Sequence, residues 1–189
     1  RLLSSAASDV YKRQPVKCAK MHVDKHVVKM IVEYAQLLST AHRMLDAVEY
    51  IGLSKNGRKV KRYRFENDYY DKTFYQAVHY HHPSAVWARA SRMNYRWLYD
   101  LFVALCDEYT YRYGKKHSTD LKLRVLLAMA PKNIPDKPFT QPTPAMSHYP
   151  DCIVEGDSLK SYHNYYIAAK NSFAKWTKRN VPSWYQLAH

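Results

Sequence analysis

Glycine is scarce in this chain, with only four residues among 189. Glycine supplies the positive backbone φ that many turns need, so its scarcity, together with several segments of helical periodicity, favours a helix-rich fold. The three cysteines, at positions 18, 106 and 152, form no CxxC pair and do not describe a disulfide scaffold. We therefore expect a reducing, cytoplasmic setting.

Long apolar runs and the commonest catalytic motifs are missing as well. No stretch approaches the roughly 18 apolar residues of a membrane-spanning helix, so no membrane partner is expected. The chain lacks a Walker loop, a GxGxxG turn, a GxSxG elbow and the HxE with PCxxC pattern of zinc deaminases. These absences argue against the commonest nucleotide-binding and hydrolase classes.

Acidic residues are heavily outnumbered. The 30 Lys and Arg residues against 16 Asp and Glu give a formal net charge of +14, and the basic residues are spread along the chain. Such an excess suits a polyanionic partner, and aromatic residues, at 14% of the chain, supply rings that can stack on bases. The composition therefore predicts a polyanionic partner.

The most informative feature that is present is a polar stripe. It consists of His22, His26, Lys29, Glu33 and Gln36, at spacings of four, three, four and three residues. On an α-helix these side chains share one face, while apolar residues cover the rest, which is typical of a helix sunk in a core. The stripe could line a cleft, where its imidazoles, ammonium and carboxylate would serve acid/base chemistry. The alternative is a solvated, salt-bridged helix face.

Periodicity predicts an all-α fold, a single domain over residues 15–189 that we expect to be a monomer. The expected helices cover about Val16 to Ala47, 69–80, Pro83 to Tyr113, 119–130 and 156–178, with Gly114 as a stop signal. Residues 52–68 carry an Asn-Gly turn signal and six basic residues, and predict a short hairpin or a mobile basic loop. Six prolines predict an irregular segment over 131–150.

Arginines on the Pro83 to Tyr113 helix are predicted to form a cationic ridge. Arg89, Arg92 and Arg96 share a face away from the expected apolar side. Surface arginines are often merely solubilising, but the basic loop and the overall charge favour phosphate binding.

A metal site is a further alternative. His22 and His26 have a spacing that can chelate a metal, and His79, His81 and His82 could add ligands. There is no HExxH motif, because Val23, Asp24 and Lys25 separate the pair, so we expect no metal and no cofactor.

Three motifs, in this order along the chain, resemble the pyrimidine-dimer DNA glycosylases, the small helical phage enzymes historically called endonuclease V. The first is Asp24-Lys25-His26 with Lys29 and with Glu33 nine positions after the Asp. The second is His82-Pro83 with Trp87, and the third is Pro182-Ser183-Trp184-Tyr185. The chain departs from the family at Val32 and Gln36, where the phage enzyme has arginines.

The resemblance implies a DNA glycosylase with abasic-site lyase activity that removes damaged or modified pyrimidines from duplex DNA. Glu33 would be the catalytic carboxylate, assisted by His26. The residues expected to bind DNA are His22, Lys25, Lys29, His82, Arg89, Arg92, Arg96, Trp184 and Tyr185. A phage origin would place the enzyme in the cytoplasm of an infected host cell.

The resemblance also implies that the amine of a processed N-terminus is the nucleophile. Residues 1–14, RLLSSAASDVYKRQ, resemble translated sequencing adapter, so we expect them to be artefactual or disordered and the native start to lie upstream of Pro15. The family's amine therefore cannot be assigned to a residue of this chain. Two alternatives remain: a non-catalytic phage DNA-binding accessory protein, and a metal-dependent nuclease built on the histidines.

Overall fold

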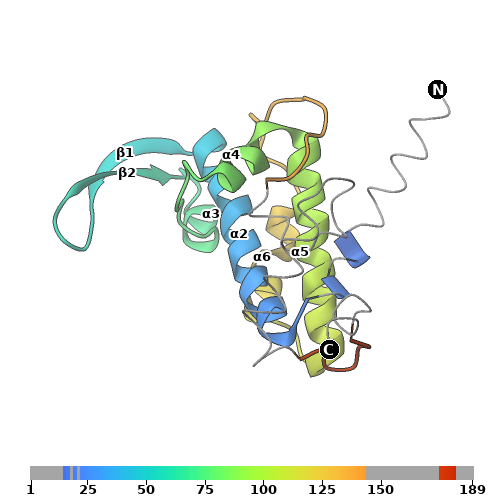
Figure 1. Cartoon of the computed structure of the whole chain (residues 1–189). Helices are drawn as coiled ribbons and strands as arrows, with labels where there is room; N and C mark the ends of the chain where they lie inside the picture. The colour runs from blue at the N-terminus through green and yellow to red at the C-terminus, as the bar shows by residue number, and fades with distance from the viewer. Residues whose placement is uncertain (1–14, 18, 21, 144–174, 182–189) are drawn as a thin grey trace.

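The fold is a group of helices with one hairpin attached (Figure 1). The computed structural model describes residues 15–17, 19–20, 22–143 and 175–181. The elements are α2 (Asp24–Asp46), β1 (Val48–Leu53), β2 (Lys59–Arg64), α3 (Asp68–Thr73), α4 (Pro83–Ala90), α5 (Arg92–Tyr113) and α6 (Ser118–Leu127).

The all-α assignment is wrong, because β1 and β2 pair as a two-stranded antiparallel sheet. The register runs from Val48 opposite Arg64 to Leu53 opposite Lys59. Of the two structures expected for residues 52–68, the hairpin is therefore the one observed, although β1 begins earlier, at Val48. Local alternation did not reveal β1 because both of its faces are exposed, and no buried face imposes a period of two.

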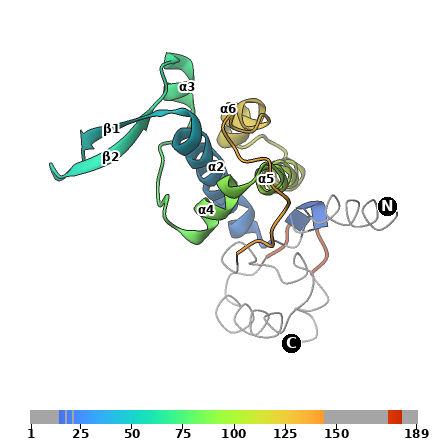
Figure 2. The same cartoon turned by 90° about the horizontal axis from the view of Figure 1, so that it is seen from above.

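Helix α2 is the central element of the helical body, and α4, α5 and α6 all pack against it (Figure 2). Its first half is amphipathic, with Lys25 and Lys29 exposed and Val27 and Ile31 buried. Its second half differs, because every residue from 38 to 43 is buried. The core continues along α5 and α6 through the apolar side chains of Leu98, Leu101, Phe102, Leu105, Leu123 and Leu127.

The helix expected from Val16 to Ala47 is interrupted before α2. Residues 15–17 and 19–20 are helical, but Val23 has an extended backbone, with φ −64° and ψ 154°, and precedes the first residue of α2. Arg112 accounts for the interruption, because its guanidinium donates to the backbone carbonyls of Lys20 and His22 at 3.1 and 2.7 Å. These carbonyls are satisfied by a side chain rather than by helical amides.

The long helix expected from Pro83 to Tyr113 is likewise two helices. Ser91 has an extended backbone and caps α5, since its hydroxyl accepts a hydrogen bond from the Asn94 amide at 3.0 Å. The Arg92 amide donates to the carbonyl of Pro135 instead of to its own helix. The two predicted ends are confirmed: Pro83 opens α4, and Gly114 stops α5 in the left-handed region with φ 68°.

The remaining expectations are met in part. The helix expected over 69–80 is shorter and ends at Thr73, whereas α6 lies close to the expected 119–130. Residues 131–143 contain no helix or strand, as the prolines predicted, and Thr140 pairs with the amide side chain of Asn94 through two hydrogen bonds. Residues 144–150, and most of the helix expected over 156–178, lie outside the described residues; the described part of that segment, 175–178, is not helical.

Candidate nucleic-acid interface

Glu33 lies in the middle of α2, on the border of its exposed face. The side chain is 41% exposed, and its carboxylate is 3.1 Å from the ammonium of Lys29, which is 67% exposed. The pair follows from helix geometry, because residues four apart face each other. Glu33 is therefore a charged, solvent-reachable carboxylate on a rigid element.

The rest of the predicted stripe divides into two parts. Lys25 is exposed in the first turn of α2, and His26 and Gln36 are half-buried farther along. His22 does not continue the stripe: it precedes the helix and is only 1% exposed. The expectation that His22 lies on the DNA-binding surface is wrong, because its side chain is enclosed by protein.

Asp24, the first residue of the resembling motif, belongs to a buried ionic network. Its carboxylate accepts hydrogen bonds from Arg112 at 3.0 Å and from the amide and hydroxyl of Thr177 at 2.9 and 2.5 Å. Burial alone would raise the pKa of Asp24, but these donors outweigh it and hold the pKa below its usual value. Asp24 therefore fastens residues near the two ends of the chain to α5.

Glu108 extends the same network on α5. Its carboxylate accepts hydrogen bonds from Arg112 at 2.8 Å and from Nε and Nη2 of Arg179 at 2.9 and 3.0 Å. Burial would raise the pKa of Glu108, and the two arginines lower it instead. Sequence reasoning missed this network, because its members lie up to 153 positions apart and only their proximity in space reveals it.

The predicted arginine ridge is broken at Ser91. Arg89 belongs to α4 and is half-buried, and burial lowers the pKa of its guanidinium. Arg92 and Arg96 are exposed on α5 and make only loose ion pairs, with Asp136 at 3.6 Å and with Asp100 at 3.7 Å. Weak, exposed pairs of this kind can exchange a carboxylate for a phosphate at little cost.

His82 has a structural role in the described chain. Its Nδ1 accepts a hydrogen bond from the Ser84 amide at 3.2 Å and so caps α4. His79 and His81 are exposed nearby. Among the described residues, no group of three or more His, Cys, Asp or Glu side chains could hold a metal ion. The histidine cluster on which the nuclease alternative depends is therefore not assembled there.

A second buried arginine fixes the hairpin to α2. The Arg43 side chain is fully buried and donates five hydrogen bonds, to the carbonyls of Tyr63, Asp71, Phe74 and Tyr75 and to the Asp71 carboxylate, at 2.7 to 2.9 Å. These acceptors span the end of β2, α3 and the turn that follows. Sequence reasoning missed this anchor, because the partners of Arg43 lie 20 to 32 positions away in other elements.

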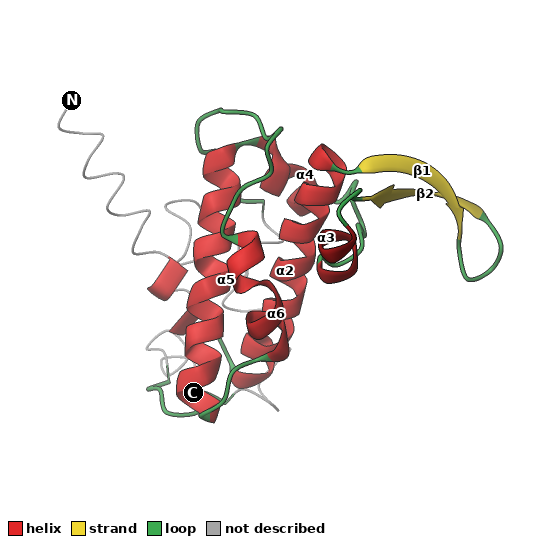
Figure 3. Cartoon of the chain, turned by 180° about the vertical axis from the view of Figure 1, so that it is seen from behind, coloured by secondary structure: helices red, strands yellow, loops and turns green. Residues whose placement is uncertain are grey.

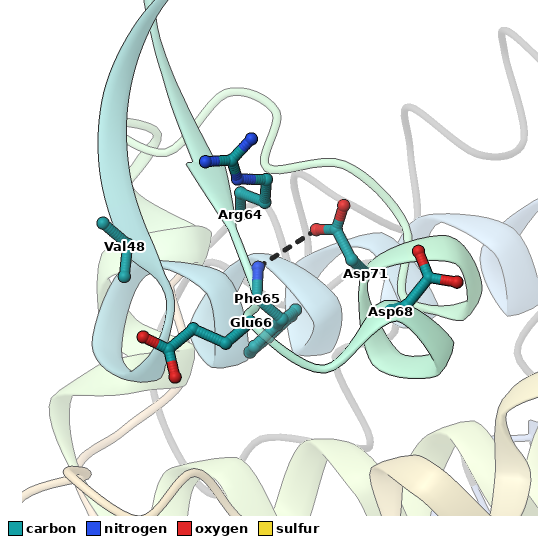
Figure 4. Close-up of a pocket in the computed structure, with 6 residues that line it drawn as sticks. All are labelled: Val48, Arg64, Phe65, Glu66, Asp68 and Asp71. Atoms are coloured by element: carbon teal, nitrogen blue, oxygen red, sulfur yellow. Dashed lines mark hydrogen bonds between the residues drawn. The ribbon is translucent and has the colours of Figure 1, made fainter.

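A pocket of about 480 Å³ lies at the foot of the hairpin (Figure 4). Its lining includes the carboxylates of Glu66, Asp68 and Asp71 together with Arg64, and the Phe65 amide donates to Asp71 at 3.1 Å. Three carboxylates repel phosphate, so this pocket does not suit a nucleic acid. None of its lining residues belongs to the polar face of α2.

Two predicted DNA-binding residues, Trp184 and Tyr185, lie outside the described residues. No family model matches the chain, and no curated protein and no solved structure is significantly similar to it. No helix in the described part of the chain is long and apolar enough to cross a membrane.

Proposed function

We propose that this protein is a DNA glycosylase with associated abasic-site lyase activity, acting on damaged or modified pyrimidines in duplex DNA. The observation that carries the proposal is the position of Glu33: a half-exposed carboxylate on a rigid central helix, within 3.1 Å of a lysine ammonium. The resemblance of its sequence surroundings to the pyrimidine-dimer glycosylases supplies the reaction class.

A carboxylate at this position has a defined task in base excision. Cleavage of the glycosidic bond builds positive charge on the sugar, and a fixed negative charge beside it lowers the barrier. Glu33 would supply that charge to an extruded nucleotide. Lys29, next to it, would hold the carboxylate in place and contact a phosphate of the same strand.

The lyase step requires an amine. The amine attacks C1′ of the sugar, and the base leaves and takes up a proton. The C1′–O4′ bond then opens to give a Schiff base, which allows the strand to be cleaved by loss of a C2′ proton and of the 3′ phosphate. A lysine becomes a strong nucleophile mainly when it is desolvated, whereas Lys29 is 67% exposed. We therefore assign the attack to an α-amino group, as in the resembled family.

A second candidate function is DNA binding without catalysis. The exposed basic hairpin favours it, because six of the 17 residues from Val48 to Arg64 are Lys or Arg and only Glu49 is acidic. Salt-dependent DNA binding is expected of both functions, so binding alone does not separate them.

The test is trapping on abasic DNA with borohydride, combined with the variant Glu33→Gln. The protein with its native N-terminus restored should form a covalent adduct, and mass spectrometry of the adduct would show whether an α-amine or a lysine is attached. Glu33→Gln should lower excision by about 10²-fold or more and leave DNA affinity within about twofold, because the amide keeps the shape but not the charge.

Glu66→Gln is the matched control, since Glu66 is an exposed glutamate in the hairpin-foot pocket, away from the polar face of α2. It should leave excision unchanged. Absence of both excision and trapping in the protein with its native N-terminus restored would favour the non-catalytic function. Equal loss of binding and excision in Glu33→Gln would make Glu33 a structural residue.

A further inference from the structure

The β1–β2 hairpin projects from the helical body as an arm, and Figures 1 and 3 show it leaving from one side. Two of its apolar side chains are largely exposed to solvent, Ile51 at 61% and Leu53 at 66%. A two-stranded sheet alone is marginally stable in water, so an exposed arm of this kind suggests a partner surface. Arg43 stabilises its foot.

One face of the arm carries arginines. Because directly paired residues share a face, the register places Tyr50 and Arg62 together, with Arg64 next along β2. The Arg64 guanidinium lies 5.2 Å from the centre of the Tyr50 ring, and Arg62 donates to the Leu53 carbonyl at 3.4 Å. Each arginine therefore has a contact within the arm that orients its guanidinium.

Gly52 makes this arrangement possible. A Cβ at this position would lie only 2.9 Å from Cγ of Arg62, so the absence of a side chain lets Arg62 cross the strand. The turn at the tip uses a second glycine, Gly57, in the left-handed region with φ 72°, and its amide donates to the Ser54 carbonyl. Two of the four glycines in the chain therefore serve this arm.

The other face neutralises the arm's single acid. Glu49 is 3.0 Å from the ammonium of Lys61 and accepts from the Tyr63 hydroxyl at 3.2 Å. The hydrogen bond with Lys61 is the main cause that lowers the pKa of Glu49, so its charge is held on that face. The arginine face, from Val48 to Arg64, carries no carboxylate of its own.

We propose that the hairpin is a DNA-binding arm whose Tyr50, Arg62 and Arg64 face lies against duplex DNA. Arginine donors suit phosphates and guanine edges, and the major groove admits a two-stranded ribbon. The inference rests on the proposed function and deepens it, because it names the surface that holds the duplex while Glu33 reacts. Arg64 also lines the acidic pocket at the foot, so it marks the inner limit of this surface, and the carboxylates of the pocket favour phosphates farther out along the arm.

Duplex DNA fits this surface better than a lipid bilayer or an apolar protein groove. On the lysine face, Ile51 is paired with Lys61 and Leu53 with Lys59. Each aliphatic side chain is thus flanked by a charge, and neither face offers the continuous apolar surface that a bilayer or a protein core would need.

The test measures the affinity of the full chain for a labelled duplex by fluorescence anisotropy at several salt concentrations. Arg62→Gln with Arg64→Gln should weaken binding about tenfold or more, and reduce the slope of log K against log salt by about two, one for each lost phosphate contact. Lys115→Gln with Lys116→Gln removes two charges from exposed positions just after α5, and should weaken binding less than twofold.

Two further variants keep the result decisive. Arg62→Lys with Arg64→Lys retains the charge, so partial recovery of affinity would support the arginine face. Lys55→Gln with Lys59→Gln tests the outer part of the arm without touching the Tyr50 contact. Equal losses in the arm and control variants, or no loss in any arm variant, would overturn the proposal.

Two other measurements distinguish the DNA-binding arm from a membrane contact and from the proposed glycosylase function. Loss of binding to anionic phosphatidylserine vesicles in the arginine variant, with unchanged DNA affinity, would make the arm a membrane contact and overturn it. Single-turnover excision at enzyme concentrations below saturation should fall in that variant in proportion to its loss of DNA affinity. If the protein with its native N-terminus restored binds DNA through Arg62 and Arg64 but excises nothing, the arm proposal holds and the glycosylase function fails.

Discussion

The two halves of α2 use similar polar residues in opposite ways. Near its end, Arg43 is fully buried with five hydrogen bonds, and its partner Asp71 is itself partly enclosed. Earlier in the helix, Glu33 and Lys29, ten and fourteen residues before Arg43, form one exposed pair. This contrast indicates that the number of hydrogen-bond partners, rather than the residue type, distinguishes a charged side chain that stabilises the fold from one that could take part in chemistry.

The two histidines of the helix repeat this contrast. His42 is buried, lies 2.8 Å from the Tyr95 hydroxyl through its Nε2 and stacks on Phe74 at 4.7 Å. His26 is half-buried in the first turns, on the half of the helix that carries Glu33. Substitutions of Arg43 or His42 should therefore change stability. Substitutions on the first half of α2, which carries Lys29 and Glu33, should change activity.

The largest effect is expected from Arg43→Met. Removing the guanidinium leaves four buried carbonyls and the Asp71 carboxylate without their donor, which typically costs about 3–5 kcal/mol. Urea unfolding should show this loss. Lys72→Met, which breaks the exposed pair with Asp68, should leave the unfolding midpoint close to that of the wild type. Similar midpoints for the two variants would contradict the anchoring role.

The next effect concerns pH. Burial lowers the pKa of His42 to about 4, against 6.5 for an ordinary histidine. Between these values the unfolded chain binds a proton that the folded chain does not. Stability from this group is therefore complete above pH 6.5 and is lost as the pH falls to about 4, by about 3 kcal/mol in all.

Urea unfolding at a series of pH values checks this expectation. His42→Phe keeps a ring against Phe74 but cannot titrate, so its stability should change less between pH 6.5 and 4 than that of the wild type. His81→Gln, at an exposed position, should retain the wild-type dependence. A His42→Phe profile parallel to that of the wild type would assign the acid sensitivity to other groups.

The smallest effect on stability is expected from Lys29→Ala. Exposed pairs four residues apart on a helix contribute about 0.3–0.5 kcal/mol, so unfolding should barely change. DNA affinity and excision should fall, because the variant removes the charge nearest Glu33. A loss of stability comparable to that of Arg43→Met would show that the first half of α2 is structural too.

Much of the helical framework could be predicted from the sequence, because it depends on local signals. Apolar periodicity located most of α2, Pro83 marked the start of α4 and Gly114 marked the end of α5. The break at Ser91 also had a local signal, a serine able to cap Asn94 three positions later, but the uninterrupted apolar pattern on both sides concealed it.

The rest depends on contacts between residues far apart in the chain. Nothing near His22 indicates that Arg112, 90 positions away, takes its carbonyl and interrupts the helix there. Glu33 and Lys29 could be identified from the sequence because they lie one helical turn apart. The roles of Arg43 and Asp24 were not, since their partners come from other elements.

The Arg43 anchor has a consequence for how the protein would occupy a damaged site. It fixes the root of the arm ten residues beyond Glu33, about 15 Å along the helix axis, or the length of roughly four base pairs. Under the proposed function, a footprint on duplex DNA would then be asymmetric, with protection extending farther from the lesion on the side of the arm. The protein would consequently approach a lesion with a set polarity.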